Sequence, residues 1–435
     1  MSEQIYFNNK EYSYLPDYNI LLNSDIERIV KKYGKKVEKQ RVLLNETLVK
    51  ENVKRINAII FELTQDCNLR CKYCIYSGKF YFHRIYNKKN LSFSIAKQVI
   101  NYFYDLLKLS DEKEIGFGFY GGEPLLNFYL MKKIVNYVEK KFYGWKIHYT
   151  LSTNGTLLHK KDIIKYMISK EFDMRISIDG PEKNHDAYRV YINGKGTFER
   201  IIRNLRFLYE KYAKYFLEHI SIGVTHSPEL SLLDIYNFFD KEDMFKDTRS
   251  ISVGDVNSIN SELYNNGEDY ASDRSKEEDE IFKQIIRKVK RGKKLSAIDK
   301  AFIKIHDIRE YIGKTIYFYS QNTCLFNSRV FIDVEGHFHI CEKGNSKFII
   351  GDYENGYNYK KMVNIYHDFE NILVERCSEC DYKFFCNLCF ASIENNGNFS
   401  FPENYCEGRK DFIKYSMERY IKLNQEGVFE YEKKK

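Results

Sequence analysis

The stretch FELTQDCNLRCKYC, from Phe61 to Cys74, decides the fold. It starts inside an apolar run, INAIIFEL at 56–63, which is typical of a buried strand. Behind that strand, Cys67, Cys71 and Cys74 lie within eight residues of one another. Thiolates bind soft metals and iron–sulfur clusters, and such sites usually take four protein ligands. Three thiolates on one loop therefore predict a cluster with one iron left for a ligand that is not protein, although cysteines buried only for packing are common.

The chain after this strand repeats a pattern of strand, turn and helix. Amphipathic helices are predicted at 94–108 and 198–212, between apolar runs of strand length. This alternation predicts an α/β fold with a parallel sheet and outer helices, and five or six such units make an open or partial barrel. The predicted strands are 56–63, 115–122, 146–155, 172–180, 219–227 and, as a sixth, 250–256.

Polar motifs stand at the ends of the predicted strands. The three cysteines follow the first strand, GGEP ends the second, STNG the third and SIDG the fourth. Chemistry in parallel α/β folds gathers at the carboxyl ends of the strands. We therefore expect all of these motifs to lie on one rim.

The segments outside this repeat have different patterns. Residues 1–55 predict a short α+β appendage with two strands, turns at Asn8–Asn9 and Pro16–Asp17, and a helix over 24–40 that begins at Ser24 or Asp25. The polar stretch 261–280 predicts a surface loop, and 281–312 a helical bridge to a cysteine-rich part. The expected organisation is 1–55 appendage, 56–260 partial barrel, 261–320 linker and bridging helices, 321–410 cysteine-rich domain and 411–435 C-terminal helix.

Charge and hydropathy exclude some classes of protein. The net charge is +8, but lysines alternate with glutamates, as on solvated helix faces, so we expect neither nucleic acid nor a membrane as partner. The N-terminus lacks the features of a signal peptide, and no apolar run reaches about 18 residues. We expect a cytoplasmic protein, in which ten cysteines serve metal binding or catalysis rather than disulfides.

Seven further cysteines lie near the C-terminus. Two C-x2-C pairs there are similar to a zinc ribbon, but only five residues separate Cys380 from Cys386, against about 12–20 in such ribbons. Seven thiolates also exceed one tetrahedral zinc site, whereas two clusters take seven as four plus three. A zinc-rich nucleic-acid-binding protein remains the alternative that is not an enzyme. The seven are Cys324, Cys341, Cys377, Cys380, Cys386, Cys389 and Cys406.

The motifs CNLRCKYC, GGEPLL, STNGT and SIDGPEKNHDAYR together resemble the radical S-adenosylmethionine (SAM) superfamily. The C-terminal cysteine pattern resembles the SPASM domain of that superfamily, and the two resemblances cover roughly residues 56–410. They imply a partial (β/α)6 radical SAM barrel followed by a SPASM domain. Within the group the chain looks like a maturase of ribosomally made peptides, of the sactipeptide or ranthipeptide type that forms thioethers. Carbon–carbon crosslinking enzymes and anaerobic sulfatase-maturing enzymes, which make formylglycine, are the alternatives.

The resemblance implies roles for residues on the rim. Cys67, Cys71 and Cys74 would hold a SAM-binding [4Fe-4S] cluster, and Tyr73 would lie against the adenine. Gly121, Gly122 and Glu123 would receive the SAM amino group, since glycines allow close approach and a carboxylate accepts from an ammonium. Arg189 would bind the SAM carboxylate, and the backbone at Val224 would contact the adenine. The ribose hydroxyls would be bound by Ser152, Asn154, Ser177 and Asp179.

The resemblance also implies two auxiliary [4Fe-4S] clusters, which makes three in all. Cys377, Cys380, Cys386 and Cys406 would hold one, and Cys324, Cys341 and Cys389 the other. Two residues precede Cys389 after Cys386 where the family has three, and an eighth cysteine of sulfatase-maturing enzymes is missing. The three-cysteine cluster therefore has an open iron that could bind a substrate thiolate. Glu342, directly after Cys341, would be a catalytic base.

The implied partners are a precursor peptide with leader and core, and an electron donor such as flavodoxin or ferredoxin. Residues 1–55 are short for a complete recognition domain, but their strands could bind a leader by strand addition.

Overall fold

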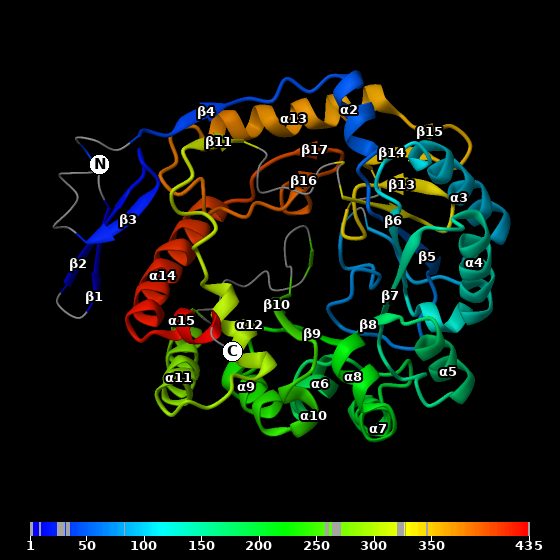
Figure 1. Cartoon of the computed structure of the whole chain (residues 1–435), viewed down its shortest axis with the longest axis horizontal. Helices are drawn as coiled ribbons and strands as arrows, with labels where there is room; N and C mark the ends of the chain where they lie inside the picture. The colour runs from blue at the N-terminus through cyan, green and yellow to red at the C-terminus, as the bar shows by residue number, and fades with distance from the viewer. Residues whose placement is uncertain are drawn as a thin grey trace.

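The computed structural model describes residues 3–433 except 8–9, 24–30, 32–34, 82, 257–260, 263–270, 320–325, 327 and 345–346 (Figure 1). Its centre is a ten-stranded sheet with the order β10-β9-β8-β7-β6-β5-β12-β13-β14-β15. The predicted α/β fold with a partial barrel is confirmed, because the first six of these strands are parallel neighbours. They are β5 (Ala58–Thr64), β6 (Glu114–Gly121), β7 (Lys146–Thr153), β8 (Asp173–Ser177), β9 (Ile220–His226) and β10 (Ser250–Asp255).

Helices follow each of these strands and cover the outer face of the sheet (Figure 1). The first of them shows the local logic: Ser92 accepts a hydrogen bond from the N–H of Ile95 at 3.1 Å, and the apolar face that follows, including Val99 and Phe103, is fully buried. The helices are α3 (Phe93–Leu107), α4 (Phe128–Lys141), α5 (Lys161–Ser169), α6 (Glu182–Tyr188), α7 (Phe198–Lys211), α8 (Ala213–His219), α9 (Leu232–Lys241), α10 (Asp243–Lys246), α11 (Ala271–Lys290) and α12 (Ala297–Ile305).

The cysteine-rich part continues the same sheet. β12 (Arg329–Ile332) pairs in parallel with β5, with Val330 opposite Ile59. The strands β13 (His337–His339), β14 (Ile349–Asp352) and β15 (Gly356–Tyr357) extend it in antiparallel order. The elements that follow are α13 (Tyr359–Cys377), the short helix η3 (Phe390–Ser392), β16 (Glu394–Asn395), β17 (Asn398–Phe399), α14 (Tyr405–Gln425) and α15 (Val428–Lys433).

The N-terminal segment contains more strand than the sequence predicted. β1 (Glu3–Phe7), β2 (Lys10–Leu15) and β3 (Ile20–Asn23) form an antiparallel sheet, and the turn predicted at Pro16–Asp17 is confirmed. The end of the helix predicted over 24–40 is wrong, because β4 (Glu38–Gln40) pairs with β11 (Ile316–Phe318). The beginning of that helix and the turn at Asn8–Asn9 lie outside the described residues. In Figure 1, β4 and α2 (Glu46–Val53) run beside α13.

Two further boundaries differ from the prediction. Residues 271–280, expected as loop, form the first half of α11, and the C-terminal helix begins at Tyr405 rather than at 411, so that it carries Cys406. None of the helices in the described part of the chain is both long and apolar enough to cross a bilayer.

Candidate functional site

The three cysteines of the first loop lie together at the carboxyl end of β5. Cys67 and Cys71 are buried and Cys74 is partly exposed. Hydrogen-bond donors point at the first sulfur, since the N–H of Leu69 lies 3.4 Å and the amide of Asn154 4.0 Å from Sγ of Cys67. Donors directed at sulfur stabilise thiolates, so this loop fits an iron–sulfur cluster bound by three cysteines.

The two glycines after β6 hold the cysteine loop in place. The N–H of Gly122 donates to the carbonyl of Thr64 at 2.9 Å. A Cβ at Gly121 would lie 2.3 Å from the carbonyl oxygen of Thr64, and one at Gly122 would lie 2.2 Å from that of Asp66. Glycines were expected here because they would let SAM approach the backbone closely. In this structure, the group that approaches them closely is the backbone of the cysteine loop.

Glu123, which the resemblance assigns to the SAM amino group, is hydrogen-bonded within the protein in this structure. Its fully buried carboxylate already accepts from the N–H of Leu125, the hydroxyl of Thr153 at 2.8 Å and the N–H of Asn154 at 2.8 Å. Burial raises the pKa of Glu123 to about 7. The residue therefore joins the end of β6 to the end of β7.

Asp179 and Arg189 form a buried ion pair beside the cysteines. Oδ2 of Asp179 accepts from Nε of Arg189 at 2.8 Å and also from the hydroxyl of Tyr73, while Oδ1 accepts from the N–H of Thr225. Nη1 of Arg189 lies 3.9 Å from Sγ of Cys71. Burial raises the pKa of the Cys71 thiol to about 12, and the guanidinium opposes that rise. Three residues predicted to touch SAM are thus bound to one another.

The other rim residues fall into two groups. Ser152 on β7 and Ser177 on β8 are partly exposed at the strand ends, where a ligand can reach them. The amide of Asn154 donates to Asn68 at 2.9 Å, which ties the third strand end to the cysteine loop. The side chain of Val224 is buried in the core, so only its backbone is available to a ligand. Sequence reasoning missed Asn68, whose only signal is its position directly after Cys67.

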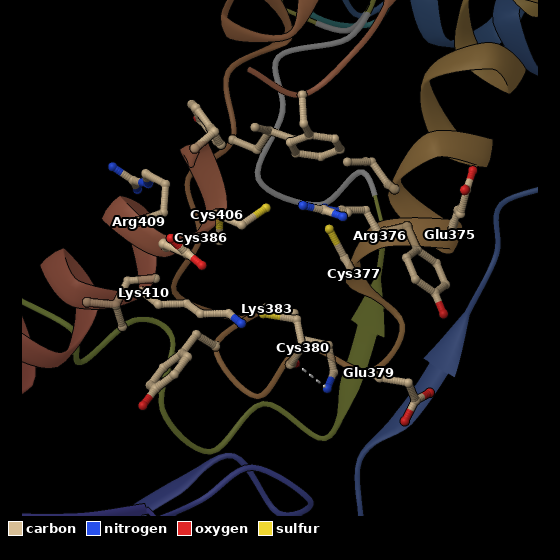
Figure 2. Close-up of a pocket in the computed structure, with 18 of the residues that line it drawn as sticks. Glu375, Arg376, Cys377, Glu379, Cys380, Lys383, Cys386, Cys406, Arg409 and Lys410 are labelled. Atoms are coloured by element: carbon tan, nitrogen blue, oxygen red, sulfur yellow. Dashed lines mark hydrogen bonds between the residues drawn. The ribbon is translucent and has the colours of Figure 1, made fainter. Parts of the chain in front are cut away.

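Four C-terminal cysteines line one cavity of about 430 Å³ (Figure 2). Cys377 ends α13, Cys380 and Cys386 lie on the loop that follows, and Cys406 is in the first turn of α14. The resemblance assigned these four cysteines to one cluster, and the structure places all four around one cavity. Burial raises the pKa values of the thiols of Cys377, Cys380 and Cys386.

Lys383 lies in this cavity and was missed by sequence reasoning. Its side chain is buried and its ammonium donates to the carbonyl of Cys380 at 3.0 Å. Within the described residues no carboxylate forms an ion pair with it. Asp381 and Glu379 attract this ammonium from beyond ion-pair distance, and four cluster-bound thiolates would add negative charge beside it, so the cavity fits a four-cysteine cluster.

Cys341 and Cys389 lie near each other in the same part of the molecule. The Cys389 thiolate is one of the charges that raise the pKa of Cys341, after burial and Glu342. Cys324, the predicted third ligand, lies outside the described residues. Glu342 is 20% exposed; its Oε1 is 3.9 Å from Nη1 of Arg329, and its buried Oε2 has no hydrogen-bond partner in the described part of the chain. A carboxylate oxygen without a partner is available to accept a proton.

A second buried ion pair connects the first loop to Cys341. Glu62 on β5 accepts from the hydroxyl of Tyr76 and lies 3.3 Å from Nε of Arg84. Nη2 of Arg84 donates to the backbone carbonyl of Glu342. Burial raises the pKa of Glu62. Sequence reasoning missed this link, because Glu62 stands in an apolar run and Arg84 in a segment without a regular pattern.

The chain is similar in sequence to known proteins. Residues 61–239 match the radical SAM superfamily. The chain is 26% identical over 392 residues to a cysteine-type anaerobic sulfatase-maturating enzyme of Clostridium novyi, which covers 84% of this chain and 96% of that protein.

Two solved structures share the fold. The anSMEcpe enzyme with bound S-adenosylmethionine has a TM-score of 0.65 at 20% identity and covers 84% of this chain and 98% of its own. Streptococcus suis SuiB bound to the precursor peptide SuiA has a TM-score of 0.55 at 14% identity and covers 82% and 77%.

Proposed function

We propose that this chain, whose residues 61–239 match the radical SAM superfamily, is a radical SAM enzyme that modifies a ribosomally made peptide by forming a thioether at a cysteine. The observation that carries the proposal is the cysteine count. Ten cysteines divide as three on the first loop, four around the C-terminal cavity and three from Cys324, Cys341 and Cys389. The last set would leave one coordination position for a substrate thiolate.

The residues of the rim would bind and orient SAM. Cys67, Cys71 and Cys74 would hold the first [4Fe-4S] cluster, which, when bound, supplies the electron that splits SAM into methionine and a 5′-deoxyadenosyl radical. Arg189 would pair with the SAM carboxylate. Tyr73 and the backbone at Val224 would contact the adenine, and Gly121, Gly122 and Glu123 would shape the site of the amino group. The ribose would lie against Ser152, Asn154, Ser177 and Asp179.

The other residues would serve the substrate. Glu342 would take the proton that the substrate cysteine releases, because one of its buried oxygens has no hydrogen-bond partner among the described residues. Residues 1–55 would bind the leader, and the position of β3 at the edge of its sheet supports strand addition there. A flavodoxin or ferredoxin would supply electrons.

A sulfatase-maturing function is the second candidate. The similarity to the Clostridium novyi enzyme extends over nearly the whole of that protein, and this favours oxidation of a cysteine in a sulfatase. The missing eighth cysteine favours the thioether instead.

Two measurements test these functions. Iron and sulfide analysis of the reconstituted chain should give about twelve irons for three [4Fe-4S] clusters; zinc without sulfide would contradict the proposal. Incubation with SAM, reductant and the peptide encoded beside this gene should give a product lighter by two hydrogens whose cysteine resists alkylation. Loss of the cysteine sulfur would identify the sulfatase-type reaction, and a free cysteine would exclude the thioether.

A further inference from the structure

The inner face of the sheet, opposite the helices, carries an arginine in the middle of β8. Met174 and Ile176 on this strand are buried in the core on the side that the helices cover. Because successive side chains of a strand point to opposite faces, Arg175 lies on the face that the helices leave free. Arg175 is exposed, and sequence reasoning gave it no role. A charged ligand on the inner face of the barrel can therefore reach it.

The side chain of Arg175 crosses the neighbouring strand β9. In the sheet, Gly223 of β9 is paired with Ser177 of β8 on one side and with Ser252 of β10 on the other. Nη2 of Arg175 donates to Oγ of Ser252 at 2.6 Å, so the guanidinium reaches across β9 at the level of Gly223. A Cβ at Gly223 would lie 2.6 Å from Nε of Arg175, which means that the glycine leaves the space that this side chain occupies. The guanidinium is thus held at the level of Ser177.

This level lies directly below the residues that would bind SAM. Nη2 of Arg189 is 3.5 Å from Oγ1 of Thr225, which stands two residues after Gly223 on β9 and on the same face. Two residues of a strand span about 7 Å, so Arg175 and Arg189 lie at neighbouring levels of the inner face. Ser177, expected beside the SAM ribose, is at the level of Arg175. A peptide residue that reacts beside the ribose would therefore have Arg175 within reach.

Arg175 has no acidic partner in the part of the chain that the structure describes. Of the five N–H groups of its guanidinium, one on Nη2 has an acceptor there, the hydroxyl of Ser252. Asp173, two residues earlier on the same face, pairs instead with Arg249 and with Nδ1 of His219 at 2.8 Å. A guanidinium that is held in place and keeps several N–H groups available is suited to bind a carboxylate through two parallel hydrogen bonds.

We propose that Arg175 binds a carboxylate of the peptide substrate and so selects which residue of the peptide lies beside SAM. The carboxylate belongs either to an aspartate or glutamate side chain near the modified residue or to the C-terminus of the peptide. Ser252 and Gly223 are positioning residues, because they act through the guanidinium. This inference rests on the proposed function for a peptide substrate, but it does not depend on which bond the enzyme forms.

Peptide binding to the reconstituted full-length chain with SAM tests the role of Arg175. The probe is the peptide encoded beside this gene, labelled for fluorescence anisotropy. R175M should weaken its binding roughly 10- to 100-fold, raise its KM by a similar factor and leave SAM affinity unchanged. R175K keeps the charge without the fork, so its peptide affinity should lie between those of wild type and R175M. Wild-type peptide binding in R175M, or a loss of SAM affinity instead, would overturn the proposal.

R249M is the matched control. Arg249 carries the same charge at the start of β10, but it is already paired with Asp173. We expect R249M to bind the peptide as the wild type does, and an equal loss in R249M and R175M would contradict a specific contact.

Altered peptides identify the source of the carboxylate. Each aspartate or glutamate of the peptide is changed singly to asparagine or glutamine, and a further peptide carries a C-terminal amide. One of these changes should weaken binding to the wild type and have no effect on R175M. For a side-chain carboxylate, lysine at that position should restore binding to R175E. If none of the changes weakens binding to the wild type, the proposal is wrong.

G223A keeps the charge of Arg175 and displaces the guanidinium. It should weaken peptide binding in the wild type and add no further loss in R175M, because both changes act on one contact. Additive losses in the double variant would contradict positioning through Arg175. Peptide that binds through Arg175 without being modified would refute the proposed reaction alone. Equal modification by the wild type and R175M would refute this inference alone.

Discussion

The ion pair between Asp179 and Arg189 makes several of the contacts that hold the candidate site together. Asp179 fixes Tyr73 and the N–H of Thr225, and Arg189 reaches from Asp179 to the sulfur of Cys71. A ligand carboxylate that arrives at Arg189 finds the guanidinium already oriented by Asp179. A guanidinium that is already held in position binds an anion without the free-energy cost of reorienting its side chain.

Arg189 should therefore be needed for SAM binding and for stability. R189M removes the positive charge and leaves Asp179 buried without its partner, which costs about 3–5 kcal/mol of unfolding free energy. We expect SAM affinity, measured by calorimetry on the reconstituted protein, to fall at least tenfold. R189K keeps the charge but loses the forked geometry of the guanidinium, so its SAM affinity should lie between those of wild type and R189M. Wild-type affinity in R189M would show that the SAM carboxylate binds at another residue.

His185 should make stability depend on pH. The side chain is fully buried, with Nδ1 3.2 Å from the N–H of Asp179 and Nε2 2.9 Å from the hydroxyl of Thr197, and burial lowers its pKa to about 4. Between pH 6.5 and 4 the unfolded chain binds a proton that the folded chain excludes. The free energy of unfolding therefore keeps its full value above pH 6.5. It decreases by about 3 kcal/mol as the pH falls from 6.5 to 4.

Urea unfolding of the cluster-free protein at pH 7 and pH 5 measures this effect. H185Q should be less stable than wild type at pH 7 but should lose less stability on acidification. Equal losses in the two proteins would assign the acid sensitivity to other groups.

At the scale of single residues, sequence could predict which side chains stand on the rim, because strand ends are visible as changes from apolar to polar runs. It could not predict that Asp179, Arg189 and Tyr73 bind one another. Such a pairing depends on distances between separate strand ends, and these are fixed only when the sheet closes. The same holds for Glu123, whose partners Thr153 and Asn154 come from the next strand.

At the scale of elements, the turn after β6 determines the position of the cysteine loop. G122A should displace that loop, because the added Cβ would lie 2.2 Å from the backbone oxygen of Asp66. We expect loss of most of the SAM-site iron and of SAM cleavage after reconstitution. Gly254 on β10 is the control, since a Cβ there would meet no atom within 4 Å. Normal iron content and cleavage in G122A would mean that the loop tolerates displacement.

Helix α11 shows why a charge-rich stretch was mistaken for a loop. Its charged first half binds neighbours: Arg274 pairs with Asp255 at 2.7 Å, and Glu277 accepts from the N–H of Leu232 at the start of α9. Its second half buries Ile281 and Ile285 at helical spacing. The helical spacing of the apolar residues could be recognised in the sequence. The contacts that the charged residues make with other elements could not be predicted from it.

At the scale of the whole molecule, the N-terminal sheet is attached to the C-terminal half. Asn19 is buried, and its amide donates to the carbonyls of Tyr311 at 2.6 Å and Lys314 at 3.2 Å. Tyr14 packs on Phe385 with ring centroids 5.2 Å apart, beside the four-cysteine cavity. Residues of the N-terminal sheet thus pack beside the four-cysteine cavity of the C-terminal part.

N19A should test this attachment. Loss of two donors removes two hydrogen bonds to partly exposed carbonyls and should cost about 1 kcal/mol of unfolding free energy. We expect slower recovery of auxiliary iron on reconstitution, with SAM cleavage by the first loop retained. N19D is the matched control, because aspartate tolerates the same positive φ of 50° yet lacks the two donors. Wild-type stability in both variants would contradict a structural role for these bonds.

The alternation of strands and helices was predictable, but the continuity of the sheet was not. Strand β12 is only four residues long and three of them are apolar, and nothing local to it identifies β5 as its partner. Parallel pairing between distant segments is specified by the packing of both faces, which a one-dimensional pattern does not contain.

The pairing of β5 with β12 also has a consequence for synthesis. While the ribosome makes the chain, the edge of β5 that will receive Val330 stays open until roughly 270 more residues have been added, a delay on the order of 10–50 s at usual translation rates. An apolar edge strand left open for that time is a site for wrong pairing with other chains. We expect nascent chains halted before residue 329 to be captured by chaperones, and yield in the cell to depend on how fast the last third of the chain is translated.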